Sequence, residues 1–348
     1  MVVCAGIAGR GAAAILAREK GLKVLVLDRN SRFGGRMISY PGRPEAGWRV
    51  DVGLHFVELG PKSSCHELNS RVGKTVEWGP FSETVEIWNG EKFVNAADLV
   101  PMTSEDKAAF RSLLMKIATL DDAEIKKWDD RSLEEWLLKN APQASVRELM
   151  TDLGMIMTTI PKAIDMAAGE VLFIARENLI KTKQVLAASY PREGMMGVTR
   201  GLVETIKENG GEIRLDVDVE EVVIKGGRAV GVRVPVGSHP YSAEYRVPET
   251  ELIEADLVVC ALPIYHLDRL LDFNPETSPL PGWWIKRIKD VRHEITGLIG
   301  YMIGLSEPVI PPDKLCFLSA LTTRRAGLPF QGFPASNFSP GVAPPGKQ

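Results

Sequence analysis

Apolar and polar positions near the start of the chain follow the pattern of a β-α-β unit. Residues 1–5 form a short apolar run that predicts a strand. Small and apolar residues recur at helical spacing over 10–20, and Gly21 then predicts the end of a helix. Residues 22–28 are again apolar and predict a second, fully buried strand. Because strands joined by such a crossover are parallel, the pattern predicts an α/β fold with a parallel sheet.

The stretch over 81–194 predicts an inserted, mostly helical unit. It begins with Asn89-Gly90, a two-residue hairpin signal between two predicted strands. Thr103 and Asp106 have the spacing of a capping box, and apolar residues at helical spacing follow them. The strands are predicted over 84–88 and 91–94, and the later helices over 131–139, 146–153 and 164–174.

After this unit the pattern returns to the sheet. A helix is predicted over 198–209, closed by Gly210-Gly211, and a β-meander and a last buried strand follow. The predicted strands cover 212–215, 216–219, 222–224, 229–234 and 255–263. We therefore predict a discontinuous nucleotide-binding domain over 1–80 and 195–265, and a substrate domain over 81–194 and 266–348.

Composition and charge narrow the function classes. The chain has 348 residues, of which 45% are hydrophobic and 25% charged, enough for a large core and about two domains. Its net charge of −3 offers no basic excess for phosphate backbones, so nucleic acid is not an expected partner. The most apolar stretch, 154–175, contains Lys162, Asp165 and Glu170, and no transmembrane span is expected. We expect a cytoplasmic protein without a signal peptide, with attachment to a membrane surface as an alternative.

The glycine-containing turn after the first strand carries the main chemical signal. Gly6 allows a pyrophosphate to approach the backbone, and Gly9 allows the helix to pack closely on the strand. The N–H groups of Ile7, Ala8 and Gly9 face an anion at the helix N-terminus. Asp28 ends the second strand at the spacing at which a carboxylate accepts hydrogen bonds from ribose hydroxyls. The turn therefore predicts a dinucleotide site.

Two residues depart from the dinucleotide fingerprint. Cys4 stands where the first glycine is expected, and a side chain there strains the turn or crowds a ligand. Arg10 is unusual at the start of a helix whose first turn packs against the sheet. We expect replacement of Cys4 by glycine to improve cofactor binding.

The residues after Asp28 and Arg29 distinguish between dinucleotides. Gly34, Gly35 and Arg36 follow closely, and they can clamp a diphosphate from a second side. Together with the turn, this arrangement resembles the FAD-binding fingerprint of the flavin amine oxidase and phytoene desaturase superfamily. The resemblance implies a Rossmann-like FAD-binding domain with an inserted substrate domain, and FAD as the cofactor.

Further segments extend the resemblance over most of the chain. Residues 51–55 are similar to the D-x-G-x-H segment of the superfamily, which passes beside the flavin, and 255–263 to its A-D-x-V-V-x-A-x-P strand. Residues 191–195 are similar to a P-x-G-G-M element, but Glu193 replaces its first glycine. His55 and His66 are expected to position the chain instead of reacting. The predicted cofactor-binding residues are Gly6, Ile7, Ala8, Gly9, Asp28, Arg29, Gly34, Gly35, Arg36, Gly53 and Val219, the last through its backbone toward adenine.

The function implied by this resemblance is FAD-dependent oxidation, with hydride abstraction from a C–H or C–N bond of a large, apolar small-molecule substrate, as in phytoene dehydrogenases. No catalytic side chain is named, because the flavin carries this chemistry, and the electron acceptor stays open. The alternatives are a flavin amine oxidase, a protoporphyrinogen oxidase-like enzyme, a nicotinamide dehydrogenase and a non-catalytic chain. The last follows from the expectation that no glycine-rich FAD element comes after Pro263, which suggests a shortened chain.

Overall fold

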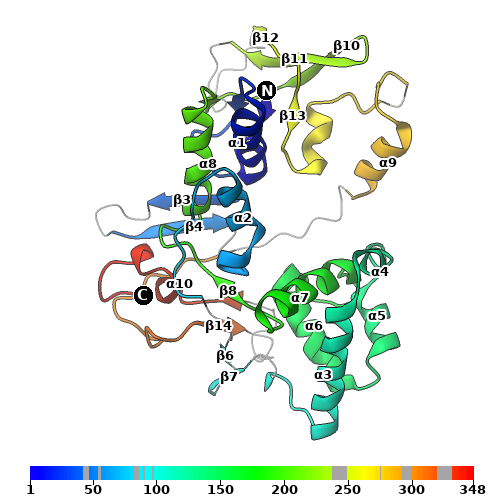
Figure 1. The fold of residues 1–348 in the computed structure, drawn as a ribbon, viewed down its shortest axis with the longest axis vertical. Coiled ribbons are helices and arrows are strands. Elements are labelled where there is room, and N and C mark those ends of the chain that lie inside the picture. The colour runs from blue at the N-terminus through cyan, green and yellow to red at the C-terminus, as the bar shows by residue number, and fades with distance from the viewer. Residues whose placement is uncertain are drawn as a thin grey trace.

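The computed structural model consists mainly of a parallel sheet with its covering elements and a separate group of helices (Figure 1). The described residues are 1–41, 47–53, 56–81, 86–88, 91–95, 98–236, 249–274, 276–291, 300–319 and 331–348. Helices α3 to α7 gather at the end of the molecule opposite the antiparallel meander (Figure 1). Within the described ranges, no helix is both long enough and apolar enough to cross a membrane.

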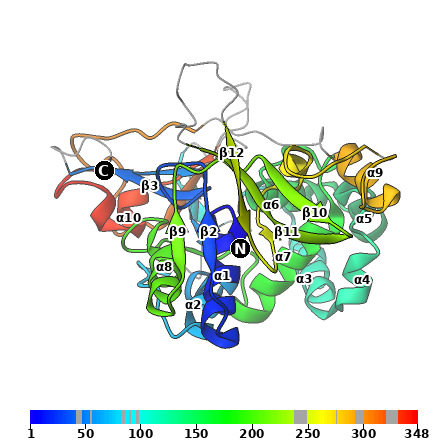
Figure 2. The same cartoon turned by 90° about the horizontal axis from the view of Figure 1, so that it is seen from above.

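The predicted parallel α/β sheet is confirmed. Its four strands lie in the spatial order β13 (Val259–Cys260), β1 (Val2–Val3), β2 (Leu25–Leu27) and β9 (Glu212–Arg214), and all pairs are parallel. Helices α1 (Ile7–Lys20) and α8 (Gly197–Glu208) pack against each other on one side of β2 and β9 (Figure 2). Helix α1 begins three residues before the predicted start, because Gly6 is its extended N-cap. Gly21 ends it with a φ of 60°, as predicted.

An antiparallel meander covers the other end of the sheet. It consists of β10 (Glu221–Lys225), β11 (Arg228–Pro235) and β12 (Thr250–Glu254), and Gly226-Gly227 forms its first turn. Its inner face packs on Val3 and Leu27 of the parallel sheet.

Two of the strand predictions in this part of the chain are wrong. Residues 216–219 are not a strand, because the backbone turns at Asp216, whose φ is 57°. Residues 255–263 contain only the two-residue β13, which within the described part of the chain pairs with β1 alone at the edge of the sheet, and Leu257 before it is 52% exposed.

The inserted unit is helical, as the apolar spacing predicts. The capping box of Thr103 and Asp106 is present at the start of its first helix. The last helix begins four residues later than predicted and runs beyond residue 174. One apolar cluster, which includes Ile117, Leu133 and Trp136, joins the helices. They are α3 (Ser104–Thr119), α4 (Asp122–Lys126), α5 (Leu133–Asn140), α6 (Ala144–Thr158) and α7 (Ala168–Thr182).

A second four-stranded sheet joins distant parts of the sequence. Its order is β15 (Gln331–Gly332), β14 (Cys316–Ser319), β6 (Glu86–Trp88) and β7 (Phe93–Asn95). The predicted pairing of β6 with β7 is antiparallel, and its turn, Asn89-Gly90, lies outside the described residues. The sheet contains segments from both halves of the predicted substrate domain, but the domain division itself stays a prediction.

The remaining strands form two short pairs, and three further α-helices lie in the described residues. The pairs are β3 (Met37–Pro41) with β4 (Arg49–Gly53), and β5 (Val57–Glu58) with β8 (Ala188–Ser189). The helices are α2 (Ser64–Arg71), α9 (Gly282–Val291) and α10 (Ala335–Phe338).

Candidate dinucleotide site

The N-terminus of α1 is open to an anion. Gly6 caps the helix with extended backbone, and it offers no side-chain acceptor to the first turn. No acidic residue lies in that turn. The first N–H groups, those of Ile7, Ala8 and Gly9, have no acceptor within the helix, and the helix dipole gives them a partial positive charge. An anion such as a diphosphate would satisfy them.

Gly6 and Gly9 are glycines for different physical reasons. A Cβ added at Gly9 would lie 1.9 Å from the carbonyl oxygen of Cys4, so glycine is required there for the helix to pack on the strand. A Cβ at Gly6 would meet only the Cys4 sulfur, at an ordinary 3.6 Å, and the φ of Gly6 is −70°. The protein itself therefore does not require glycine at position 6. The missing side chain leaves space in front of the turn for a ligand.

The loop at Gly34-Gly35 lies against this turn, as the clamp hypothesis requires. The Gly34 N–H donates to the carbonyl of Ala5 at 3.2 Å, and Gly34 and Gly6 form a parallel bridge. Gly35, with a φ of 57°, comes so close that an added Cβ would lie 3.3 Å from the Gly6 Cα. The structure therefore brings together Gly6 and Gly34, which are 28 positions apart in the sequence.

Gly53 lies next to Arg36, the residue that follows the Gly34-Gly35 loop. It pairs with Met37 across β3 and β4, and an added Cβ would lie 2.7 Å from the carbonyl oxygen of Arg36. Its φ of 97° is reached readily by glycine alone. Arg29 and Arg36 are both exposed, so their guanidinium groups are accessible to a ligand.

Asp28 has more contacts within the protein than the sequence predicts. It is 5% exposed, and its Oδ2 accepts from the Ala5 N–H at 2.6 Å. Its Oδ1 accepts from the Asn30 backbone N–H and from the Asn30 side-chain amide, at 2.9 and 2.8 Å. The carboxylate thus fixes the turn, and its remaining lone pairs stay available to a hydroxyl group.

Val219 lies near the same end of the sheet. The N–H of Val217, two residues earlier, donates to the Asp28 carbonyl at 2.9 Å. The Val219 side chain is buried in the cluster under the meander.

The two departures from the fingerprint are both visible in the structure. Cys4 has a φ of 89°, in the region that favours glycine. Burial raises the pKa of its thiol, and the nearby Asp28 raises it further, whereas the Gly6 N–H and Arg10 lower it. Arg10 is fully buried beside the turn, which sequence reasoning did not foresee. Burial lowers the pKa of its guanidinium to about 10, so the group keeps its charge at neutral pH.

Asp51 connects the β3–β4 pair to the segment before α8, a link that the motif alone does not reveal. Its carboxylate accepts from the Ser39 hydroxyl and, at 3.2 Å, from the Met195 N–H. Burial raises the pKa of Asp51, while these hydrogen bonds lower it. His66 accepts a hydrogen bond from the Trp78 indole at 3.1 Å, a positioning contact, and His55 lies outside the described residues.

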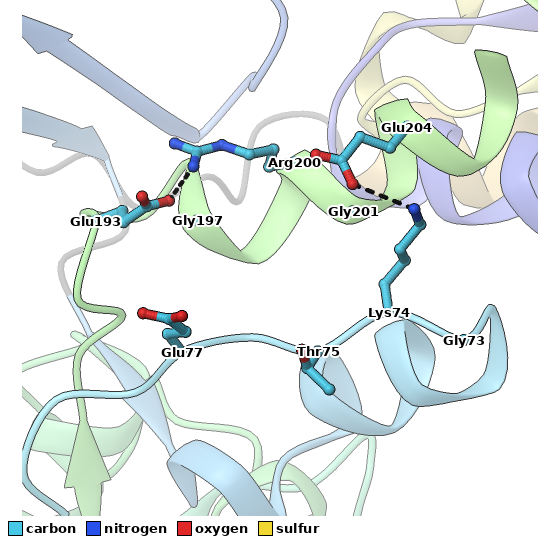
Figure 3. A pocket seen from close by; sticks show the side chains of 9 residues that line it. All are labelled: Gly73, Lys74, Thr75, Glu77, Glu193, Gly197, Arg200, Gly201 and Glu204. Carbon is cyan, nitrogen blue, oxygen red and sulfur yellow. Dashed lines mark hydrogen bonds and ion pairs between the residues drawn. The ribbon is translucent and has the colours of Figure 1, made fainter. Parts of the chain in front are cut away.

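A polar cleft of about 280 Å³ lies between α8 and the segment after α2 (Figure 3). Glu193, which replaces the expected glycine, points toward Arg200 and pairs with it. Lys74 pairs with Glu204 in the same cleft at 3.2 Å. Four of its charged side chains therefore neutralise one another, and they leave no excess positive charge in this cleft for a diphosphate.

Comparison with known proteins gives a consistent result. The family model of the flavin-containing amine oxidoreductases matches residues 7–346. A prolycopene isomerase of Daucus carota is 24% identical over 70% of this chain and 44% of its own. A phytoene desaturase of Rhodobacter capsulatus is 24% identical over 68% of this chain and 50% of its own. The chain thus spans about half the length of these two relatives.

The crystal structure of an oxidoreductase from Methanosarcina mazei shares the fold, with a TM-score of 0.73 over 99% of this chain and 76% of that one, at 18% identity. The predicted superfamily and its flavin cofactor are confirmed by the family match. The chain belongs to the flavin-containing amine oxidoreductase family.

Proposed function

We propose that the N-terminus of α1 and the loop 34–36 bind the ADP half of FAD. The observation that carries this proposal is the space in front of Gly6, a position where neither φ nor packing requires glycine. The uncapped first turn of α1 and the adjacent loop give that space an electropositive wall. These features fit a diphosphate, and the residues around them match the family fingerprint.

The main predicted residues have defined tasks in this proposal. The N–H groups of Ile7, Ala8 and Gly9 donate to phosphate oxygens, and the exposed guanidinium of Arg36 adds charge from the second side. Asp28 holds the turn and accepts from a ribose hydroxyl. Further binding residues in the proposal are Gly34, Gly35, Gly53, Arg29 and Val219.

Bound FAD supplies a hydride acceptor for oxidation of a C–H or C–N bond. The protein's contribution is to bind, to orient and to exclude water, and we propose no acid or base among its side chains. We propose an apolar substrate, because the two curated relatives are named for prolycopene and phytoene. An amine is the alternative, since the family model is named for amine oxidoreductases.

The binding proposal is tested with Gly6→Ala. The added methyl group has room within the protein, so far-UV circular dichroism and the melting temperature should stay close to those of the wild type. FAD affinity, measured by titrating the apoprotein, should fall at least about tenfold, which corresponds to 1.4 kcal/mol. Gly282→Ala is the matched control, because its added Cβ meets no atom within 4 Å and its φ is unremarkable. Unchanged FAD affinity in Gly6→Ala would refute the proposed site.

Two further measurements define the cofactor and the substrate class. Arg36→Ala should weaken FAD binding by about 1.5–3 kcal/mol, the contribution of a charge-assisted hydrogen bond. Tight NAD binding without FAD binding would contradict the choice of dinucleotide. Anaerobic mixing of the FAD-loaded protein with a polyene or with a primary amine, followed by flavin absorbance, tests the substrate. Bleaching by the amine alone would contradict the apolar substrate.

A further inference from the structure

Arg10 combines full burial with an unpartnered charge. Its side chain is 0% exposed, and neither Nη1 nor Nη2 has a hydrogen-bond partner within the described structure. Nε makes a single long contact, 3.4 Å, to the carbonyl oxygen of Gly6. A guanidinium group normally uses several of its five N–H donors when it is buried. Burying such donors without acceptors is costly, which makes the arrangement unusual.

The surroundings of Arg10 do not neutralise it. Asp28 is the nearby acid, but its oxygens accept from Ala5 and Asn30, and no ion pair between Asp28 and Arg10 is formed. The face of the Phe33 ring lies 5.1 Å from the Arg10 Cζ, a cation–π contact that only partly compensates for lost hydration. Within the described residues the charge is therefore retained without a hydrogen-bonded partner of opposite sign, although the attraction of the nearby Asp28 raises the pKa of Arg10 against the effect of burial.

The position of Arg10 relates this charge to the dinucleotide site. Arg10 directly follows Gly9 in the first turn of α1, and its Nε touches Gly6, the residue that leaves space for a ligand. Phe33 directly precedes Gly34 and Gly35, so the Arg10 side chain contacts one of the two glycine segments that form the walls of the site and the residue next to the other. An anion bound between these walls would lie at the helix N-terminus, and the guanidinium of Arg10, which is fully buried in the ligand-free protein, would turn toward it to bind.

We propose that Arg10 is a phosphate-binding residue of the dinucleotide site, whose buried charge destabilises the free protein and is neutralised by a diphosphate. The inference rests on the proposed function and adds a residue that the fingerprint does not contain. It predicts that replacing Arg10 by an uncharged residue raises the stability of the ligand-free protein and weakens phosphate binding. If Arg10 served packing alone, its replacement would lower the stability instead of raising it.

The test compares Arg10→Met with the wild type in three ligand titrations of the apoprotein, using FAD, ADP and adenosine. Arg10→Met should bind FAD and ADP roughly 10- to 150-fold more weakly, the range that a charge-assisted hydrogen bond represents. Its affinity for adenosine should stay within about twofold, because adenosine has no phosphate. The salt dependence of ADP binding should become shallower in the variant. The urea midpoint of the ligand-free variant should be higher than that of the wild type.

Arg10→Lys gives a second measurement that keeps the charge but not the planar donors. Its ADP affinity should lie between those of the wild type and Arg10→Met, with the salt dependence of the wild type. Equal losses for ADP and adenosine, or unchanged ADP affinity in Arg10→Met, would refute the role of Arg10 and leave the FAD site intact. A wild type that binds neither FAD nor ADP would instead refute the proposed function together with this inference.

Discussion

Replacement of Cys4 by glycine is expected to stabilise the protein. The φ of Cys4 is 89°, where a residue with a Cβ has a strained backbone, at a cost of about 1–2 kcal/mol. Glycine removes this strain but gives the unfolded chain more freedom, which costs about 0.4–1 kcal/mol. The net backbone gain for Cys4→Gly is about 0–1.6 kcal/mol, with a centre near 0.8 kcal/mol. In a chain of this size, that is a rise in melting temperature of about 2 °C.

The matched control is Cys4→Ala, which removes the thiol but keeps the Cβ and therefore the strain. Both variants lose the contacts of the half-buried sulfur, so the difference in stability between them reports the backbone strain at position 4. Differential scanning calorimetry of the apoproteins measures the difference. Cys4→Gly should melt above Cys4→Ala and above the wild type.

The same substitution bears on cofactor binding. The Cys4 sulfur lies 3.6 Å from the place where a Cβ of Gly6 would be, so it borders the space in front of the turn. Removing it should raise FAD affinity as well as stability. If Cys4→Gly melts no higher than Cys4→Ala, the strain argument is wrong, and the turn has adapted to its cysteine.

Three other changes test the packing and electrostatics. Gly9→Ala should lower the free energy of unfolding by about 3 kcal/mol or more, seen as a lower urea midpoint, because its Cβ would overlap the Cys4 carbonyl. Asp51→Ala should lower it by about 1–3 kcal/mol, because the Met195 N–H is left buried without an acceptor. Burial raises the pKa of Glu58 from 4.5 to about 7, so its native carboxyl holds a proton that the unfolded state releases, and stability should fall as pH rises from 4.5 to 7. In urea titrations at a series of pH values, the free energy of unfolding of Glu58→Gln should not fall between pH 4.5 and 7. A wild type that is more stable than Glu58→Gln above pH 7 would contradict this prediction.

Local periodicity predicted the elements whose ends are set by local chemistry. Helix α3 begins at the capping box of Thr103 and Asp106, and α1 ends at the left-handed Gly21, as their sequences indicate. Helix α7 was placed less well, because its apolar spacing begins in a turn, at Ile164, before the helix itself starts at Ala168. Apolar spacing shows which face of a helix is buried, but it does not fix the residue at which the helix begins, and no side-chain cap marks the start of α7.

Strand prediction failed where burial depends on distant neighbours. Residues 255–263 are apolar enough for a central strand, yet among the described residues β13 pairs with β1 alone. Whether a strand is central or at an edge depends on sheet order, which is a long-range property. Likewise, Asp51 belongs to a family-like motif, but its hydrogen bond to Met195 joins residues 144 positions apart.

The candidate site shows what a glycine motif does and does not reveal. Gly6 and Gly9 are identical letters in the sequence, and only the distances around them show that Gly9 serves packing whereas Gly6 leaves space for a ligand. Arg10 interrupts the same motif, and from the sequence it counts against a packed helix start. In the structure its charge is buried beside that space without a partner, so a departure from the fingerprint becomes an argument for an anion at the turn. Burying a guanidinium without a partner in contact is costly, and among the described residues no acid forms an ion pair with Arg10, although the nearby Asp28 attracts its charge. The binding experiments on Gly6 and Arg10 therefore examine one physical question, which is whether a diphosphate is the missing partner of this charge.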